Sequence, residues 1–384
     1  MKVFVLAGEA SGDRLGGALM AGLKLLADVR FEGIGGPLMQ AEGLVSIFPM
    51  DELSVMGITE VLPKYLHLKR RIRQTADAVL ASGADVLVTI DSPDFSLRVA
   101  ALVKAQSNIR TVHYVAPSVW AWRAGRAAKM AKVIDHVLAL LPFEPPYMEA
   151  AGMDCDFVGH PVVAEPQASA AQIVEFRTQH GLADAPVLLV LPGSRKGEVA
   201  RLGPIFGQAL APVLAQRPDL RLVVPTTGHV ATLLRGIVAD WPAQPILIDP
   251  SDMKSSLYKH EKMCAFGAAT GALAASGTVS LELAASETPM VIAYDVSWMS
   301  RQIIAAMLKI DTLTLVNLVS ETRSIPECNG KHCKPQEITA ALLKILSAPE
   351  SQREAMRLTM ERLGKGGESP GLRAARAVLK GLGR

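Results

Sequence analysis

The sequence of 384 residues has little charge and few aromatic side chains. Charged residues make up 20% of the chain and aromatic residues 5%, whereas 49% are hydrophobic, which excludes a disordered chain. The 40 basic and 37 acidic residues leave a net charge of only +3, whereas a dedicated nucleic-acid binder typically has a clear excess of basic residues. We therefore expect no nucleic-acid partner and, from the length, two folded domains.

Cysteine is also scarce. Four cysteines are too few for a disulfide framework in a chain of this length, and we interpret them as reduced thiols of a cytoplasmic protein. Cys328 and Cys333, with His332 beside them, offer one corner of a zinc site, but the sequence has no second pair of ligands to complete it. We therefore expect no metal and no other cofactor.

Long runs of large apolar residues are lacking as well. The apolar run after Met1 ends within a few residues and is followed by Glu9 and Asp13, so it predicts a first strand rather than a signal peptide. Residues 264–281 carry no charge, but they are mainly Ala, Gly, Ser and Thr rather than the Leu and Ile of a membrane span. We expect any membrane contact to be peripheral.

Short apolar runs alternate with longer helical patterns along both halves of the chain. Continuously apolar strands are typical of a parallel sheet covered on both faces. We predict strands at 2–7, 30–35, 84–91, 110–115 and 136–141, and again at 187–191, 220–225, 245–248, 271–275 and 289–293. The fold class is therefore α/β, with two doubly wound Rossmann-like domains.

The proline-containing segment 159–171 marks the predicted domain boundary. We expect an N-terminal domain at 1–165, a C-terminal domain at 166–349 and a helical tail at 350–384 that packs back on the first domain. Ligands of such sheets bind beyond the carboxyl ends of the strands. The expected site is thus a cleft across which the domains face each other.

Polar turns follow the first three predicted strands. Glycines let the backbone approach a ligand, and a helix start offers free N–H groups, but a tight turn capped by Ser11 or Asp13 explains the first turn equally well. Asp91, after the third strand, either accepts a proton from an attacking hydroxyl or caps the next helix. Glu9 is a second acid on this edge, and the candidate ligand loops contain Ser11, Gly12, Gly35 and Gly36.

The second domain has two turns suited to phosphate, although no G-x-G-x-x-G fingerprint and no Walker A motif occurs. The first turn contains an arginine, whose planar fork matches phosphate oxygens. The second opens a helix with small residues, and an acid one turn later could accept both ribose hydroxyls. Capping explains either turn alone, but together they predict a nucleotide-diphosphate site formed by Gly193, Ser194, Arg195, Ser276, Gly277, Thr278 and Glu282.

Residues 58–73 combine apolar side chains at helical spacing with five basic residues. One interpretation is an amphipathic helix whose basic face is solvated. The other is an interfacial helix that meets anionic lipid. The candidate membrane-facing residues are Val61, Leu62, Tyr65, Leu68, Lys69 and Arg70.

Taken together, these segments resemble the lipid-A-disaccharide synthases over essentially the whole chain. The resemblance lies in LAGEASGD at 6–13, MQAEG at 39–43, VMGITEVL at 55–62, IDSPDF at 90–95, HYVAPSVWAWR at 113–123, LPGSR at 191–195 and ASGT at 275–278. The long block at 113–123 makes a chance match a poor explanation.

The resemblance implies an inverting glycosyltransferase of the two-domain GT-B type. Members of this family transfer 2,3-diacylglucosamine from UDP-2,3-diacylglucosamine to 2,3-diacylglucosamine 1-phosphate (lipid X). The products are the lipid A disaccharide 1-phosphate and UDP, made at the cytoplasmic face of the inner membrane. The family also suggests a homodimer with exchanged C-terminal segments.

The resemblance further implies roles for individual residues. Asp91 is the expected base, with Glu9 the alternative, and Arg195 with the turn at 276–278 would meet the charge that develops on the leaving diphosphate without a metal. Glu282 would bind the ribose, and Asn317 matches a family asparagine near the donor. Because acyl chains need an apolar groove or the bilayer, the resemblance also favours the lipid interpretation of residues 58–72.

One position departs from the family pattern: Asp295 stands where we expect Lys or Arg. Two other functions fit the same fold. An epimerase or a soluble-acceptor glycosyltransferase acting on a UDP-amino-sugar would not need the basic, apolar helix at 58–73. In a nucleotide-binding protein without catalytic activity, Asp91, Glu9 and Arg195 would be incidental.

Overall fold

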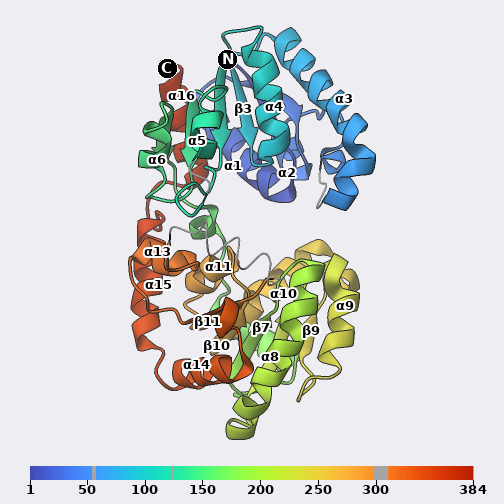
Figure 1. Cartoon of the computed structure of the whole chain (residues 1–384), viewed down its shortest axis with the longest axis vertical. Helices are drawn as coiled ribbons and strands as arrows, with labels where there is room; N and C mark the ends of the chain where they lie inside the picture. Colours follow the sequence, from blue (N-terminus) through green and yellow to red (C-terminus); the bar gives the residue numbers. More distant parts are fainter. Residues whose placement is uncertain (54–57, 123–124, 297–309, 384) are drawn as a thin grey trace. The chain divides into compact units, whose positions relative to one another are not determined.

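The computed structural model describes residues 1–53, 58–122, 125–296 and 310–383, with only the backbone described at 58–64. The chain forms two compact units (Figure 1). The first contains Met1–Ala164 together with Gly366–Arg384, and the second contains Glu165–Lys365. The second unit is therefore an insertion in the sequence of the first.

The first unit contains a parallel sheet of six strands in the order β2-β1-β3-β4-β5-β6. Because β1 lies between β2 and β3, the direction of winding reverses between β1 and β3. The strands are β1 (Lys2–Ala7), β2 (Arg30–Ile34), β3 (Val86–Ile90), β4 (Arg110–Tyr114), β5 (His136–Ala139) and β6 (Asp154–Phe157). The helices are α1 (Ala10–Leu26), α2 (Pro37–Ala41), α3 (Ile58–Ser82), α4 (Pro93–Lys104), α5 (Gly125–Met130), α6 (Pro145–Glu149) and α16 (Pro370–Gly381).

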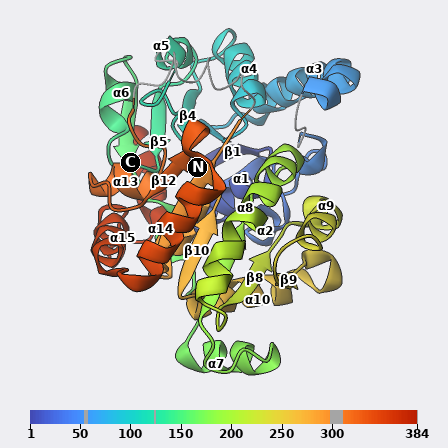
Figure 2. The same ribbon diagram turned by 60° about the horizontal axis from the view of Figure 1, so that its bottom comes forward.

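The second unit repeats this plan with the strand order β12-β11-β10-β7-β8-β9, which reverses between β7 and β10. The strands are β7 (Val187–Leu191), β8 (Arg221–Pro225), β9 (Ile246–Ile248), β10 (Gly271–Ala274), β11 (Met290–Tyr294) and β12 (Glu327–Asn329). The helices are α7 (Ala170–Gln179), α8 (Lys196–Gln216), α9 (Gly228–Val238), α10 (Ser255–Ala268), α11 (Val279–Ala285), α13 (Leu315–Ser320), α14 (Pro335–Ser347) and α15 (Glu350–Arg362). Helices α8 and α14 pack side by side in this unit (Figure 2).

The predicted α/β class with two doubly wound sheets is confirmed, and the central strands are buried as expected of sheets covered by helices. Every residue of β3 and of β7 is buried. The sequence pattern missed the short edge strands β6 and β12, which contain polar residues and so lack an apolar run. The helix between β4 and β5, α5, has only six residues.

The C-terminal segment divides between the units, which differs from the expectation of one tail at 350–384. Helix α15 belongs to the second unit, where the Gln352 amide pairs with the backbone of Met290 at 2.8 and 3.1 Å. Helix α16 instead lies along α1 (Figure 1). A Cβ on Gly22 would lie 2.7 Å from the carbonyl oxygen of Gly371, so glycines allow the two helices to approach closely.

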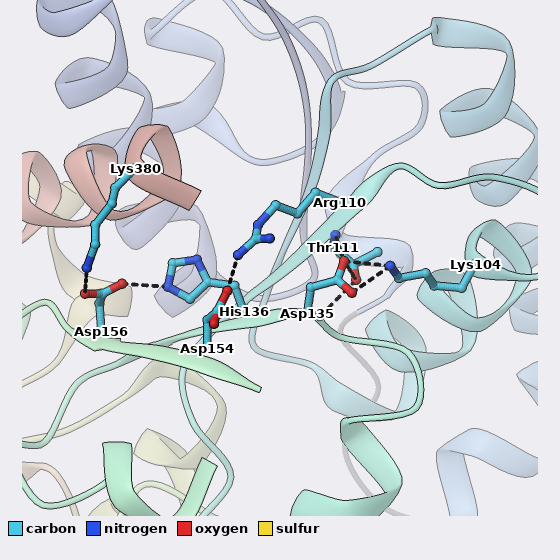
Figure 3. Close-up of polar contacts among 8 residues, drawn as sticks. All are labelled: Lys104, Arg110, Thr111, Asp135, His136, Asp154, Asp156 and Lys380. Carbon is cyan, nitrogen blue, oxygen red and sulfur yellow. Dashed lines mark hydrogen bonds and ion pairs between the residues drawn. The ribbon is translucent and has the colours of Figure 1, made fainter. Parts of the chain in front are cut away.

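Helix α16 also reaches the amino ends of β4, β5 and β6 (Figure 3). There Arg110 pairs with Asp154 at 2.5 Å, and the Asp156 carboxylate bridges His136 at 2.9 Å and Lys380 of α16 at 3.3 Å. A cavity of about 630 Å³ opens beside these side chains. This edge of the sheet is opposite the carboxyl ends of the strands, so the network fixes the C-terminal end of α16 on the side opposite the candidate site.

Candidate active site

The predicted site residues gather where the winding of each sheet reverses. In the first unit, Glu9 and Ser11 follow β1, and Asp91 follows the neighbouring strand β3. In the second unit, the turn at 192–195 follows β7, and the turn at 275–278 follows the neighbouring strand β10. Such switch points are where open α/β sheets bind ligands.

The backbone is strained at the carboxyl edge of the first sheet. Asp91 and Ser92 have φ of 53° and 44°, and Val115, which follows β4, has φ of 89°. Non-glycine residues rarely adopt this left-handed region, and a β-branched valine does so least readily. Strain of this kind persists only where the surroundings enforce it, and it clusters at functional sites.

Asp91 holds its carboxylate in a short polar network. Its Oδ1 accepts the Ser92 N–H at 2.8 Å, and its Oδ2 accepts the Ser11 hydroxyl at 3.4 Å. Its backbone N–H donates to the Tyr114 carbonyl at 3.0 Å, which continues the pairing of β3 with β4 beyond the strand ends. Asp91 is half-buried, so its carboxylate is fixed and still reachable. Glu9, the other candidate base, is the N-cap residue of α1 and is also half-buried.

The glycines of the first unit serve packing within the protein. A Cβ on Gly12 would lie 3.3 Å from the Cβ of Ala7, so this glycine lets α1 approach β1. The N–H of Gly35 donates to the Ser46 hydroxyl at 3.2 Å, and that of Gly36 donates to Asp13 at 2.9 Å. In this structure the last two amides are therefore engaged by the protein itself.

Asp13 explains why the Gly36 turn is so well fixed. Its carboxylate is only 3% exposed and accepts the backbone N–H groups of Gly36, Leu38 and Met39 at 2.9 to 3.0 Å. These are the free donors at the start of α2, so Asp13 caps a helix other than its own. It thereby ties the first turn of α1 to the end of β2.

In the second unit, Glu198 occupies the turn that follows β7. Its Oε2 accepts the N–H groups of Ser194 and Arg195 at 3.2 and 3.3 Å, while its Oε1 accepts from the Arg195 guanidinium at 3.1 Å and the Tyr294 hydroxyl at 3.2 Å. Gly193, at φ 116°, has no room for a Cβ because Glu198 lies 2.6 Å away. The Arg195 side chain itself is 70% exposed.

The turn that follows β10 is open. Gly277 has φ of 151° and nothing within 4 Å of where a Cβ would stand, and Thr278 beside it is exposed. Ser276, before it, is half-buried. Glu282 is one turn further on in α11, where its carboxylate pairs with Lys262 of α10 at 2.5 Å. The two partners are each about one-third exposed, so Glu282 is within reach of a ligand.

Asn317 is buried and fully engaged. Its Nδ2 donates to the Ile325 carbonyl and to the Glu327 carboxylate at 3.0 and 3.1 Å, and its Oδ1 accepts the Ile325 N–H at 3.0 Å. Glu327 also accepts the backbone N–H groups of Leu313 and Thr314. Asn317 therefore fixes the loop around α13 rather than presenting its amide to a ligand in this structure.

The sequence pattern missed Arg201 and Glu144. Asp295, where we expected a cation, forms an ion pair with Arg201 of α8 at 3.8 Å, so an arginine from another element supplies a positive charge there. Glu144 is a buried carboxyl in the loop after β5, with N–H donors from Leu140, Leu141 and Trp120. Neither residue has a sequence signal, because both pairings depend on the folded arrangement.

His113, the first residue of the motif at 113–123, is buried in the core. Its Nδ1 lies 2.7 Å from the Thr89 hydroxyl, and burial lowers the pKa of the imidazole to about 4. His160, next to the unit boundary, is similarly buried, and its pKa is also lowered to about 4. Both rings are therefore neutral at physiological pH, which suits packing rather than cation binding.

Helix α3 turns part of its predicted face inward. Leu68 packs against the core and Ile72 is buried, whereas Tyr65 and Leu66 are 47% and 78% exposed. Lys69, Arg70 and Arg73 are exposed, but Arg71 pairs with Glu52 at 2.7 Å and lies over the Phe48 ring. The side chains of Val61 and Leu62 lie outside the described residues.

No helix among the described residues is both long enough and apolar enough to cross a bilayer. All four cysteines are in the described part of the chain, and none forms a disulfide bond.

Comparison with known proteins shows the family to which the chain belongs. A family model described as lipid-A-disaccharide synthetase matches residues 3–379. The chain belongs to the lipid-A-disaccharide synthase family. The family member from Ruegeria pomeroyi is 66% identical over 383 residues, covering 100% of this chain and 96% of that protein, and the one from Rhodospirillum centenum is 45% identical, covering 98% and 94%.

Lipid-A-disaccharide synthases are glycosyltransferases, so this chain is an enzyme of lipid A biosynthesis. Among solved structures, it is similar in fold to a UDP-GlcNAc 2-epimerase from Neisseria meningitidis bound to UDP-GlcNAc. That similarity has a TM-score of 0.66 at 13% identity and covers 100% of this chain and 99% of the epimerase. The low identity makes it a likeness of fold alone.

Proposed function

We propose that the enzyme joins two acylated glucosamine units, with the acceptor sugar bound at the β1–β3 edge and the UDP-linked donor at the β7–β10 edge. The donor is UDP-2,3-diacylglucosamine and the acceptor is lipid X. The supporting observation is that predicted site residues of both units flank the two positions where winding reverses. One unit offers half-buried carboxylates, and the other offers an arginine with open glycine turns.

On the acceptor side, the primary hydroxyl of lipid X attacks the anomeric carbon as the bond to the UDP oxygen breaks, which inverts the configuration. A carboxylate must take the hydroxyl proton during this step. Asp91 is suited to it, because the Ser11 hydroxyl and the Ser92 N–H hold its two oxygens in a fixed direction. Glu9 is the alternative, since it caps the adjacent helix α1 on the same edge.

On the donor side, the diphosphate gains charge as the glycosidic bond breaks. Arg195 and the turn from Ser276 to Thr278 would receive it, because fixed donors directed at developing charge lower the barrier without reorganising. Glu282 would accept the ribose hydroxyls. Its ion pair with Lys262 would then break, or the two side chains would move together. Gly193 and Ser194 shape the phosphate turn, and Asn317 acts by holding the loop around α13 in place.

The activity is tested by incubating the purified protein with UDP-2,3-diacylglucosamine and lipid X and measuring lipid A disaccharide 1-phosphate and UDP. Equal amounts of the two products would support the proposal. Folded protein that binds UDP and forms no disaccharide would refute it. UDP-GlcNAc without lipid X serves as a control for epimerisation, the reaction named for the structural neighbour.

We further propose that the enzyme works as a peripheral protein on the anionic surface of the inner membrane, with helix α3 as the contact. The exposed Tyr65 and Leu66 supply an apolar contact, and Lys69, Arg70 and Arg73 surround it with positive charge. Both substrates carry acyl chains, so a contact on the acceptor unit would bring that unit to them. A homodimer stays a proposal from the family resemblance.

A further inference from the structure

Glu144 lies in the loop that follows β5, at the same edge of the first sheet as Asp91. The strands of this sheet are parallel, so the ends of β3, β4 and β5 lie in a row. Glu144 is five residues after Ala139, the last residue of β5, and its side chain turns back into the protein with only 4% exposure.

The Glu144 carboxylate connects two segments that leave adjacent strands. Its Oε2 accepts the N–H groups of Leu140 and Leu141 at 3.1 and 3.0 Å, which fixes it to the end of β5. Its Oε1 accepts the indole N–H of Trp120 at 3.3 Å. The Trp120 ring also meets Phe143 edge-on, with the ring centroids 5.1 Å apart. A single carboxyl thus holds the tryptophan against the β5 loop.

These three described donors are neutral. A buried carboxylate with only neutral donors is destabilising, because no positive charge compensates for its lost hydration. Burial raises the pKa of Glu144 to about 7, even though the N–H donors act in the opposite direction. The nearby titratable group on β6 is Cys155, whose pKa burial raises to about 12, so it stays a neutral thiol. An apolar side chain would leave these three N–H groups without an acceptor, so the carboxyl satisfies donors from the β5 loop and from Trp120 at once.

The segment held by Glu144 begins next to Asp91. Val115 leaves β4 with φ of 89°, directly after Tyr114, whose carbonyl accepts the Asp91 N–H at 3.0 Å. A strained exit from a strand keeps its conformation only when the segment beyond it is fixed. The Trp120 contact is a fixed point five residues further on.

We infer that Glu144 is a positioning residue, which through Trp120 holds the segment from Val115 to Trp120 beside Asp91 and so shapes the acceptor side of the site. The inference rests on the proposed function, because it assigns the acceptor to this edge. Glu144 does not touch the reacting atoms. It acts on the geometry of the residues that do.

Two substitutions break the contact in different ways. In Glu144→Gln, the amide oxygen still accepts from Leu140 and Leu141, but the amide NH₂ faces the indole N–H, so two donors oppose each other. In Trp120→Phe, the ring against Phe143 is kept and the donor is lost. We expect each variant to lower kcat about 10-fold and to raise the KM for lipid X, because small misplacements of reacting groups are costly. The KM for the UDP-sugar should stay within about twofold.

The double variant should be no slower than the slower single variant, because both changes break one contact. Glu149→Gln, an exposed acid of α6 in the same part of the chain, is the matched control and should keep full activity. A Glu144→Gln enzyme with normal kcat, or losses that multiply in the double variant, would overturn the inference. Should Glu144→Gln fail to fold, Trp120→Phe carries the same test.

Indole emission tests the contact without any substrate. The difference between wild-type and Trp120→Phe spectra isolates Trp120, and it should change with pH around a midpoint near 7 as Glu144 gains its proton. The change should be absent in Glu144→Gln. At any one pH the Trp120 component should also differ between the wild-type protein and Glu144→Gln, because the indole N–H loses its acceptor, and identical components would contradict the inference. If the wild-type protein forms no disaccharide, the proposed function fails, and this comparison of spectra still decides whether the contact exists.

Discussion

The carboxyl edges of the two sheets follow one topology but are stabilised in different ways. In the first unit, three residues in the left-handed region and the buried carboxyls Asp13 and Glu144 fix the loops in place. In the second unit, glycines at positive φ shape the turns, and the polar side chains pair with one another, as Glu198 does with Arg195. The first edge is built for fixed geometry, and the second for exchanging internal partners for a ligand.

This difference has a physical reason in the proposed reaction. A base must stand at one distance from one hydroxyl, so rigidity is useful on the acceptor side. A nucleotide diphosphate brings its own negative charge and would replace an internal anion that occupies its place. The pair of Arg195 with Glu198 keeps both charges compensated until then. Substitutions on the two edges should therefore affect different steps.

The largest effect is expected on the acceptor edge. Asp91→Asn should lower kcat by about 10²–10⁴-fold, because the amide cannot take the proton of the attacking hydroxyl. UDP affinity, measured by calorimetry, should hardly change. Glu9→Gln is the parallel variant: if it abolishes turnover while Asp91→Asn retains it, the base is Glu9.

A smaller and different effect is expected on the donor edge. Arg195→Ala should lower kcat/KM for the UDP-sugar about 100-fold and weaken UDP binding, since a donor to the diphosphate is lost. Arg195→Lys should recover only part of this, because an ammonium cannot bind two oxygens as a guanidinium fork does. Unchanged UDP affinity in the alanine variant would mean that the phosphates lie elsewhere.

Glu282→Gln should raise the KM for the donor roughly 10-fold, because hydrogen bonds to a charged group contribute about 1.5–3 kcal/mol. It should leave kcat nearly unchanged if the ribose is bound equally in the ground and transition states. Lys262→Met is the informative companion. It removes the internal partner of Glu282, so a lower donor KM in that variant would show that the ion pair competes with the ligand.

The pH dependence of stability should be concentrated in the first unit. Burial lowers the pKa of His113 and of His160 to about 4, so these rings stabilise the fold above about pH 6.5, and the contribution is lost as the pH falls toward 4. Glu144 acts in the opposite direction. Because its pKa is raised to about 7, its contribution to the stability of the fold is greatest at low pH and is lost as the pH rises through 7. Melting temperatures across this range should fall less on acidification in His113→Asn, and more in Glu144→Gln.

The last comparison concerns the membrane contact, where the effect is expected on vesicle binding and not on the catalytic step. Replacing Lys69, Arg70 and Arg73 by Gln should weaken binding to anionic vesicles by about 1 kcal/mol for each charge, and high salt should abolish the difference. Tyr65→Ser with Leu66→Ser should weaken it further. Leu25→Ser is a matched control, since Leu25 is as exposed as Leu66 but belongs to another helix. Equal losses in the control would place the contact elsewhere on the unit.

The comparison also shows which features a sequence can predict. Buried strands such as β1 and β7 are apolar runs in the sequence, and the order of such runs along the chain predicts the doubly wound class. The turns at the ends of the strands were predictable because parallel strands bring their carboxyl ends to one edge. The edge strands β6 and β12 were not, because a strand paired on one side need not be apolar.

Partners across the fold could not be predicted at all. Asp13 caps α2 instead of its own helix, Arg201 provides the charge beside Asp295, and Glu144 finds Trp120 in another loop. In each case the two residues are brought together by packing, and nothing local marks them as a pair. The same holds for Leu68, whose inward direction depends on how α3 lies on the sheet.

The return of α16 to the first unit also bears on how the protein is made. During synthesis from the N-terminus, the six strands of the first sheet and the whole second unit emerge before residues 370–381. Until then, the surface of α1 around Gly22 has no helix to cover it, and Asp156 lacks Lys380. The first unit is thus begun first and completed last, so a chain cut short after the second unit would contain a complete second unit and an incomplete first unit.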